Sequence, residues 1–483
     1  MILATVLIGA TMSALDVSIV NIAMPTLKTD FNVSLGTIEW VAMAYMLALT
    51  IFLPLFGRLA DMYGRSRLYN AGFVVFTIGS ALCGMSPTAN FMIGSRTLQA
   101  IGAGLLQANS IAIITAAFPS NERGKAIGFQ GSVQAVAMSV GPLAGGLLIS
   151  LIGWRAIFYI NVPIGALGTL AALLILPRDG VKKEEEKVDW PGALFFSSGL
   201  LLLVLAFNEM FRLGLASLRI ELYLLLAAVL LGLFIITELR VRYPLVDLTM
   251  FRDFTFSAGN LTGMLSYYVL FAVMFLIPFY LERVVGYSVV LTGGLLTPIP
   301  LAMAVAAPWA GSVSDRRGPR LMTTTGMLLC ALACFLLMLL GESSHLAVLV
   351  GILIMLGAGI GLFTPPNNSA IMGAAPRDKL SVAGGLLNMM RSLGLIFGVD
   401  VSGLIFISLE DKYIVEKGFY DVRHIFHNRL IPVSVKDKAF MRGYLAVLGV
   451  LVALSLLSAF LSALRNERPG EDAISAAKEL ERA

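Results

Sequence analysis

Long uninterrupted apolar runs constrain the fold of this sequence more than any other feature. Windows of about 20 residues with few charges recur along the chain, and its charged residues gather in short clusters between them. Only 13% of the 483 residues are charged, against about 25% in ordinary soluble domains. A transmembrane barrel would instead show segments of about ten residues with alternating hydrophobicity. The sequence therefore predicts an all-α polytopic membrane protein.

Apolar windows that are long enough to cross a bilayer predict fourteen transmembrane helices. We place them near residues 2–26, 38–57, 68–87, 91–117, 126–151, 156–176, 191–210, 220–239, 255–281, 288–313, 321–341, 345–372, 382–408 and 443–464. The first window lacks the basic region and short apolar core of a cleavable signal peptide, so we expect this helix to be retained. Cys83, Cys330 and Cys334 lie inside these windows, which indicates packing rather than disulfide or metal chemistry.

The distribution of basic residues between alternate loops predicts the orientation of the chain. Cytoplasmic loops of membrane proteins keep an excess of Lys and Arg, and this excess appears here if the N-terminus lies inside. Both termini are therefore predicted to be cytoplasmic. The formal net charge of +5 does not indicate nucleic-acid binding, because the basic residues lie at helix ends rather than in one patch.

A repeated loop motif predicts that the chain contains two related halves. GRLADMYGRSR at 57–67 follows the second predicted helix, and GSVSDRRGPR at 311–320 follows the tenth. Parallel repeats of this kind place a substrate site at their interface near the membrane midplane, which is the architecture of a transporter. The predicted domains are an N-terminal six-helix bundle (1–176), a two-helix insertion with cytoplasmic linkers (177–254), and a C-terminal six-helix bundle (255–483) with an outer loop at 409–442 and a short cytoplasmic tail.

Six sequence motifs occur in order along nearly the whole chain. They are LDVSIVNIAMP, GRLADMYGRSR, RTLQAIGAG, GPLAGG, GWRAIFYINVP and NMMRSLG. With these motifs the chain resembles the major facilitator superfamily, and in detail its fourteen-helix drug:proton antiporter branch of the EmrB/QacA type. The resemblance implies a major facilitator fold with 14 transmembrane helices (6 + 2 + 6) in a bacterial cell (inner) membrane. It also implies a small-molecule substrate, protons as the coupling ion, no cofactor and a monomer.

Ionisable residues inside the predicted helices are functional candidates, because burying a charge in lipid is costly. Asp16 and Arg96 fall at a similar depth in the first and fourth predicted helices. A carboxylate that exchanges a proton for a substrate can be tuned by burial and by a nearby guanidinium. The resemblance favours proton coupling through this pair. A fixed ion pair that holds the two helices together is the alternative.

The loop after the second predicted helix is expected to act as a conformational latch between the halves. Its glycines permit close packing and a tight turn, and its aspartate presents a charge at the cytoplasmic face. The resemblance implies that this aspartate meets the positive N-terminal end of the thirteenth helix, near Ser381, in the outward-facing state. As the alternative, the arginines of this loop serve only to fix the orientation of the chain in the membrane. The predicted latch residues are Gly57, Arg58, Asp61, Gly64, Arg65 and, from the second copy of the motif, Asp315.

A proline among glycines in the fifth predicted helix indicates a kinked and closely packed segment. These residues are Gly141, Pro142, Gly145 and Gly146. The resemblance associates this string with antiporters that export their substrates. A purely structural kink remains the alternative reading.

Polar side chains among Met, Phe and Leu form the candidate substrate cavity. They are Asn21, Tyr45, Gln99, Gln134, Tyr267, Asn388 and Arg391. Such a mixture suits bulky amphipathic molecules, and the chain has no phosphate-binding loop motif that would indicate ATP hydrolysis. Asp400 lies on the opposite helix face from Arg391, and we interpret it as a wetted helix-end residue, with a second proton carrier as the alternative.

These features predict a proton-coupled multidrug efflux transporter that exports amphipathic or cationic compounds by alternating access. A dedicated exporter of a single metabolite, antibiotic or lipid would use the same helices and stays open as an alternative. A polytopic membrane enzyme is a remote alternative, because His345, His424 and His427 lie in predicted outer loops without a matching acid motif. No catalytic or metal site is predicted.

Overall fold

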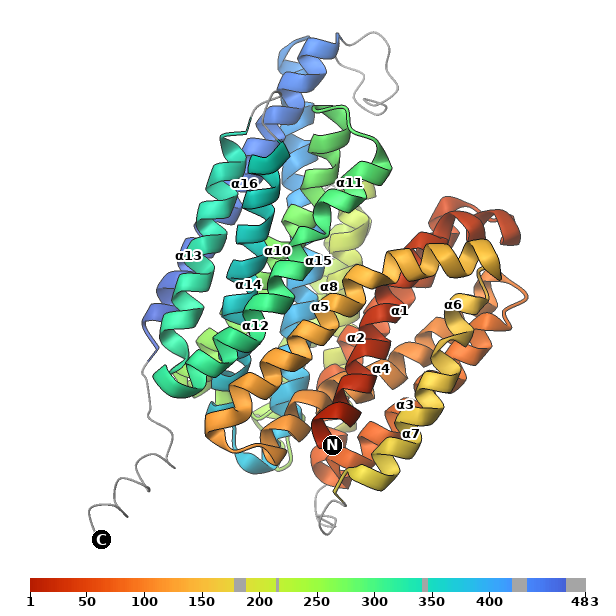
Figure 1. Cartoon of the computed structure of the whole chain (residues 1–483), viewed down its shortest axis with the longest axis vertical. Coiled ribbons are helices and arrows are strands. Elements are labelled where there is room, and N and C mark those ends of the chain that lie inside the picture. The colour runs from red at the N-terminus through yellow and green to blue at the C-terminus, as the bar shows by residue number, and fades with distance from the viewer. Residues whose placement is uncertain (178–187, 214–216, 341–345, 419–431, 466–483) are drawn as a thin grey trace.

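The computed structural model describes residues 1–177, 188–213, 217–340, 346–418 and 432–465. All regular secondary structure in these ranges is helical, which confirms the all-α prediction for the described part of the chain. Thirteen of its helices are long and apolar enough to cross a membrane. The long helices form two bundles that lie close together at one end and diverge at the other, and α1 begins and α16 ends toward the end where the bundles meet (Figure 1).

The N-terminal bundle consists of α1 (Ile2–Phe31), α2 (Leu35–Tyr63), α3 (Arg65–Gly84), α4 (Ala89–Ala117), α5 (Ser120–Leu151), α6 (Ala156–Tyr159) and α7 (Asn161–Ile175). Ser34 and Thr88 cap α2 and α4 by accepting backbone hydrogen bonds from the first turn. The helix α3 is absent from the thirteen spans, because the polar residues in its first two turns lower its hydropathy. It packs between α4 and α7 instead of facing lipid over its whole surface.

The C-terminal bundle consists of α10 (Phe254–Arg283), α11 (Val289–Leu296), α12 (Pro298–Arg317), α13 (Pro319–Met338), α14 (Leu346–Ala374), α15 (Leu380–Glu416) and α16 (Val433–Ala463), with short 3-10 turns η1 (Leu248–Arg252) and η2 (Arg377–Lys379) before α10 and α15. The described part of the predicted outer loop at 409–442 is largely helical, because α15 and α16 extend into the loop from both sides. Only residues 419–431 of that loop lie outside the described chain.

The helices between the bundles are α8 (Trp190–Leu213) and α9 (Leu218–Glu238). The helix α8 packs against both α2 and α15, and the rings of Phe207 and Phe397 meet at 4.8 Å between α8 and α15. The helix α9 packs on α8 through Phe234 and Phe196, whose ring centres lie 4.9 Å apart. Its other face carries exposed leucines, as expected for a helix against lipid.

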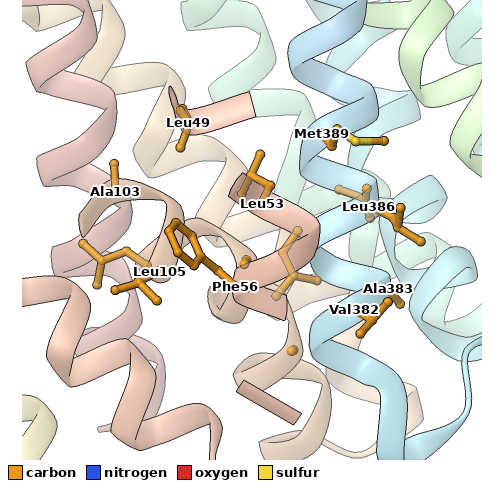
Figure 2. Close-up of a cluster of buried hydrophobic side chains, with 14 of the residues drawn as sticks. Leu49, Leu53, Phe56, Ala103, Leu105, Val382, Ala383, Leu386 and Met389 are labelled. Carbon is orange, nitrogen blue, oxygen red and sulfur yellow. The ribbon is translucent and has the colours of Figure 1, made fainter. Parts of the chain in front are cut away.

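One apolar core joins the two bundles. Buried side chains of α2 and α4 meet side chains of α15, including Leu53, Phe56, Val382 and Leu386 (Figure 2). A second core lies entirely within α10 to α16 and the turns between them. The bundles are therefore held to each other along two seams, where α15 lies along α2 and α4 and where α12 and α14 lie along α5.

Candidate functional site

Asp16 of α1 and Arg96 of α4 form a buried ion pair. Asp16 Oδ2 lies 2.6 Å from Arg96 Nη1, and the two residues are 0% and 1% exposed. Arg96 Nη1 also donates to Gln99 Oε1 at 2.6 Å, and Arg96 Nε donates to the carbonyl oxygen of Val41 at 3.2 Å. The guanidinium lies 4.2 Å from the ring centre of Tyr45. The structure thus brings together the two charged residues that the sequence singled out.

Two amides complete the surroundings of the carboxylate. Gln99 Nε2 donates to Asp16 Oδ1 at 2.8 Å, and Asn161 Nδ2 donates to the same oxygen at 3.2 Å. Both amides also donate to Ser80 Oγ at 3.0 Å. Three side-chain donors therefore surround the Asp16 carboxylate, one guanidinium and two amides.

Sequence reasoning missed Asn161 and Ser80. Asn161 belongs to the motif GWRAIFYINVP, which carries a signal for it, whereas no sequence pattern marks Ser80. Gln99 and Tyr45 were expected in the substrate cavity. Both are 0% exposed, and the structure places them inside the Asp16 network.

The first latch joins the turn between α2 and α3 to the start of α15. Asp61 Oδ1 and Oδ2 accept hydrogen bonds from the backbone nitrogens of Ser381 at 3.1 Å and Val382 at 2.9 Å. Arg65 Nη2 lies 3.1 Å from Asp61 Oδ1 and donates to the carbonyl oxygen of Arg377 at 2.8 Å. A carboxylate therefore caps the N-terminal end of α15, where free backbone donors and the helix dipole favour an anion.

Glycines allow the helices of this latch to approach each other. A Cβ on Gly57 would lie 2.4 Å from the carbonyl oxygen of Ser381, so no larger residue fits at this crossing. Gly64 has a φ of 103°, which glycine adopts readily and which turns the chain from α2 into α3. Arg58, the remaining predicted latch residue, is 6% exposed on α2.

The second latch repeats this geometry between the turn from α12 to α13 and the start of α5. Asp315 Oδ1 and Oδ2 accept hydrogen bonds from the backbone nitrogens of Gly124 at 2.8 Å and Lys125 at 2.9 Å. A Cβ on Gly311 would lie 2.1 Å from the carbonyl oxygen of Gly124. Gly318 repeats the positive φ at 81°. The two copies of the loop motif thus make reciprocal contacts between the bundles.

The glycines around Pro142 differ in their surroundings. A Cβ on Gly141 would lie 1.8 Å from Ser18 Oγ, and one on Gly145 would lie 3.2 Å from Ile19 Cγ1, so both glycines press against α1. A Cβ on Gly146 would meet nothing within 4 Å. Close packing therefore involves two of the three glycines, and α5 continues through Pro142.

Tyr267, Asn388 and Arg391 lie together between α10 and α15. The Arg391 guanidinium lies 4.4 Å from the Tyr267 ring centre and donates to the Tyr267 hydroxyl. Arg391 forms no ion pair within the described part of the chain. Asn388 Nδ2 donates to the carbonyl oxygen of Gln107 on α4 at 3.0 Å, which links the two bundles. These groups present a cation, an aromatic ring and an amide at the interface of the bundles.

The remaining residues that the sequence predicts in or near the substrate cavity are Gln134, Asn21 and Asp400. Gln134 is half-buried on α5, and the side chain of Asn21 lies outside the described residues. Asp400 lies well inside α15, which continues to Glu416, so its interpretation as a helix-end residue is wrong. Its Oδ2 is buried without a hydrogen-bond partner among the described residues.

The match of residues 6–399 to the family model of the Major Facilitator Superfamily agrees with this arrangement. The riboflavin transporter RibZ of Clostridioides difficile is 38% identical over 82% of this chain and 86% of its own length. The multidrug resistance protein Stp of Mycobacterium tuberculosis (strain CDC 1551 / Oshkosh) is 33% identical over 82% of this chain and 74% of its own. The tetracenomycin C resistance and export protein of Streptomyces glaucescens is 31% identical, with 84% and 76% covered.

Solved structures show the same fold at low sequence identity. The human organic anion transporter MFSD10 (TETRAN) superposes with a TM-score of 0.64 at 16% identity and covers 95% of this chain and 98% of its own. The proton:xylose symporter XylE has a TM-score of 0.63 at 14% identity, with 95% and 94% covered.

Proposed function

Because this chain belongs to the major facilitator superfamily, a family of membrane transporters, we propose that it is a proton-coupled exporter of amphipathic small molecules. The observation that carries this proposal is the Asp16 carboxylate, which is fully buried and is held by one guanidinium and two amides. A carboxylate in such surroundings changes its charge only together with a rearrangement of its neighbours. Proton uptake at Asp16 is thereby tied to movement of α1 against α4.

The proposed membrane topology has fourteen spans in a 6 + 2 + 6 arrangement. The thirteen apolar helices and α3 support that number, and the repeated latches relate α2 and α3 to α12 and α13. The domains are then 1–176, 177–254 and 255–483. The excess of basic residues supports cytoplasmic termini in a bacterial inner membrane.

In the proposed cycle the structure corresponds to the outward-facing state. Asp61 and Asp315 both accept backbone hydrogen bonds from helices of the opposite bundle, and the latches lie at the end of the molecule where α1 begins and α16 ends. Protonation of Asp16 weakens its bond to Arg96 and frees Gln99, so that α1 and α4 shift and the substrate site changes sides. Release of the proton to the cytoplasm restores the network. This order exchanges an entering proton for a leaving substrate.

The proposed substrate site includes Tyr267, Asn388 and Arg391, with Asn21 and Gln134 as further candidates. Arg391 offers a cation without a carboxylate partner among the described residues, so it favours substrates with electronegative groups and disfavours permanent cations. The relatives named for riboflavin and for tetracenomycin C transport agree with a polar aromatic substrate. They also support a second candidate function, a dedicated exporter of one such compound.

Transport in proteoliposomes tests the proposal. With an imposed pH gradient, acidic inside, we expect uptake of riboflavin or of a fluorescent amphipathic dye without a permanent positive charge by the parent protein, and loss of that uptake in Asp16→Asn. Glu221→Gln, which changes an exposed carboxylate on α9, serves as the matched control and should transport like the parent. Uptake of riboflavin alone would favour the dedicated exporter. Gradient-driven uptake that survives in Asp16→Asn would remove Asp16 as the proton carrier.

A further inference from the structure

Two buried carboxyl groups converge at the latch-side end of the inserted helices. Asp189 lies directly before α8, Glu238 is the last residue of α9, and each is 6% exposed. Asp189 Oδ1 accepts a hydrogen bond from the backbone nitrogen of Gly192 at 3.0 Å. Asp189 Oδ2 is buried and has no hydrogen-bond partner among the described residues. A Cβ on Gly192 would lie 2.1 Å from this oxygen and 3.2 Å from Glu238 Oε1, so both carboxyl groups face the same point.

Glu238 also holds the chain that follows α9. Its Oε1 and Oε2 accept hydrogen bonds from the backbone nitrogens of Leu245 at 3.1 Å and Val246 at 3.4 Å. Leu245 and Val246 belong to the buried apolar core that also contains Phe196. Two carboxyl groups that face the same point in apolar surroundings repel each other when both are ionised.

Charged groups reach this pair from each element packed around it. From α2, Arg58 is buried close enough to Glu238 to interact with it electrostatically. Asp61 and Arg65, which form an ion pair with each other, come one and two helical turns after Arg58 in the sequence. From the chain after α9 and the start of α15, Asp247 Oδ2 lies 2.5 Å from Lys379 Nζ. A cavity of about 210 Å³ lies beside Arg58, and its lining also includes Arg242, Asp247, Asp378 and Lys379. The cavity offers a polar route from the latch-side surface to Arg58.

We propose that Asp189 and Glu238 form a second proton-binding site, separate from Asp16, whose occupancy is linked to opening of the first latch. The pair belongs to the insertion, which is attached to α15 through the Asp247–Lys379 ion pair and the Phe207–Phe397 contact. Arg58 belongs to α2, one turn before Asp61. Although α8 also packs on α2, these two contacts hold the insertion to α15, so that separation of α2 from α15 withdraws Arg58 from the carboxyl pair.

The direction of the linkage follows from this geometry. With the latch closed, Arg58 favours the ionised pair and so weakens proton binding. With the latch open, the pair loses that cation and binds a proton more tightly. Linkage is reciprocal, so a proton on the pair favours the open latch, and a rise in pH favours the closed one.

Distance measurements between the bundles test this inference. Spin labels on cysteines at Asn121 and Pro376, exposed residues of the two bundles, report latch opening in the purified full-length protein. Every variant carries Asp16→Asn, so that Asp16 does not contribute and the result does not depend on the proposed transport cycle. We expect the ratio of closed to open molecules to rise with pH, by up to about tenfold per pH unit for one linked proton.

Substitutions at the pair decide between proton binding and a structural role. Glu238→Gln and Asp189→Asn should each remove the rise of the closed fraction with pH, and Glu221→Gln should retain it. Asp189→Asn keeps an acceptor for the Gly192 nitrogen, so it gives an answer if Glu238→Gln does not fold. A pH profile that is flat in the Asp16→Asn background, or that persists in both pair variants, would overturn the proposal.

Discussion

In the first latch a carboxylate from the last turn of α2 caps the N-terminal end of α15, whereas in the second a carboxylate from the last turn of α12 accepts hydrogen bonds from the second turn of α5. Both make two backbone hydrogen bonds of 2.8 to 3.1 Å, and both rest on a glycine pressed against a backbone carbonyl. They differ after the second glycine, where Arg65 stands in the first copy and Pro319 in the second. Arg65 bonds both Asp61 and the chain before α15. The repeat thus supplies a carboxylate bound to two backbone nitrogens twice, and Arg65 adds an ion pair in the first copy.

The largest effect is expected from filling the two helix crossings. Gly57→Ala and Gly311→Ala each place a methyl group within 2.4 Å and 2.1 Å of a backbone oxygen, and neither backbone can yield without moving a helix. Overpacking of this kind costs about 1–3 kcal/mol, so each variant should reduce the ratio of closed to open molecules by roughly five- to 150-fold. Label distances between Asn121 and Pro376 measure this. Gly351→Ala, where a Cβ meets nothing within 4 Å, should behave like the parent.

A smaller and unequal effect is expected from neutralising the caps. Asp61→Asn and Asp315→Asn each keep an acceptor oxygen and remove the negative charge beside the backbone nitrogens near a helix start, where such a charge contributes about 0.3–1 kcal/mol when exposed and up to about 2 kcal/mol when partly buried. Asp61→Asn should reduce the closed fraction more, because it also leaves Arg65 without its ion pair. The same label distances compare the two variants. Equal losses would show that Arg65 adds nothing to the first latch.

Removal of the arginine alone sharpens the comparison further. Arg65→Gln leaves the backbone hydrogen bonds of Asp61 and Asp315 intact. We therefore expect it to reduce the stability of the closed state by about 0–1 kcal/mol, as for a partly exposed ion pair, and to make the first latch resemble the second. High salt should reduce the difference between the parent and this variant. A loss as large as that of Asp61→Asn would mean that Arg65, rather than the cap, holds the latch closed.

The smallest effect concerns Asp247, for which the second latch has no counterpart. Burial alone would raise the pKa of Asp247, but hydrogen bonds from Lys379 and Thr249 hold that pKa below its usual range. The carboxylate therefore stabilises the fold above its usual pKa of about 3.9, and this contribution is lost as the pH falls through the lowered pKa. Asp247→Asn should melt at a lower temperature than the parent at pH 7, and the difference should shrink below about pH 4.

Lys379→Gln is the matched partner for that comparison. The double variant should lose little beyond either single change if the ion pair accounts for the effect. A difference in melting temperature that stays constant down to acid pH would contradict the assigned role of the Asp247 charge.

Much of the fold could be predicted from the sequence, because apolar runs mark the membrane helices and the loop repeat marks two equivalent turns between helices. The helix positions agree to within several residues for most spans, and the repeat locates both latches. The extension of α15 to Glu416 was missed, because its last two turns carry Glu410, Asp411 and Lys412, which are typical of a loop beyond a membrane. In the structure Glu410 is buried and paired with Arg283 at 2.9 Å.

The site was only partly predictable for a related reason. Asp16 and Arg96 stand out because a charge in an apolar helix is unusual, whereas Ser80 and Asn161 are common in transmembrane helices and are distinguished only by where the tertiary fold places them. The same holds for Asp189 and Glu238, which lie at helix ends in sequence but are buried by the chain that folds back over them.

Accessibility of the substrate site tests alternating access most directly. A cysteine at Gln134, with an impermeant thiol reagent applied to either side of the membrane, reports which side the site faces. In the parent we expect modification mainly from the side opposite the chain ends, because both latches are closed in this structure. In the double variant Asp61→Asn with Asp315→Asn, modification should shift to the side of the chain ends. Unchanged sidedness in that variant would contradict the role of the latches in closing the transporter.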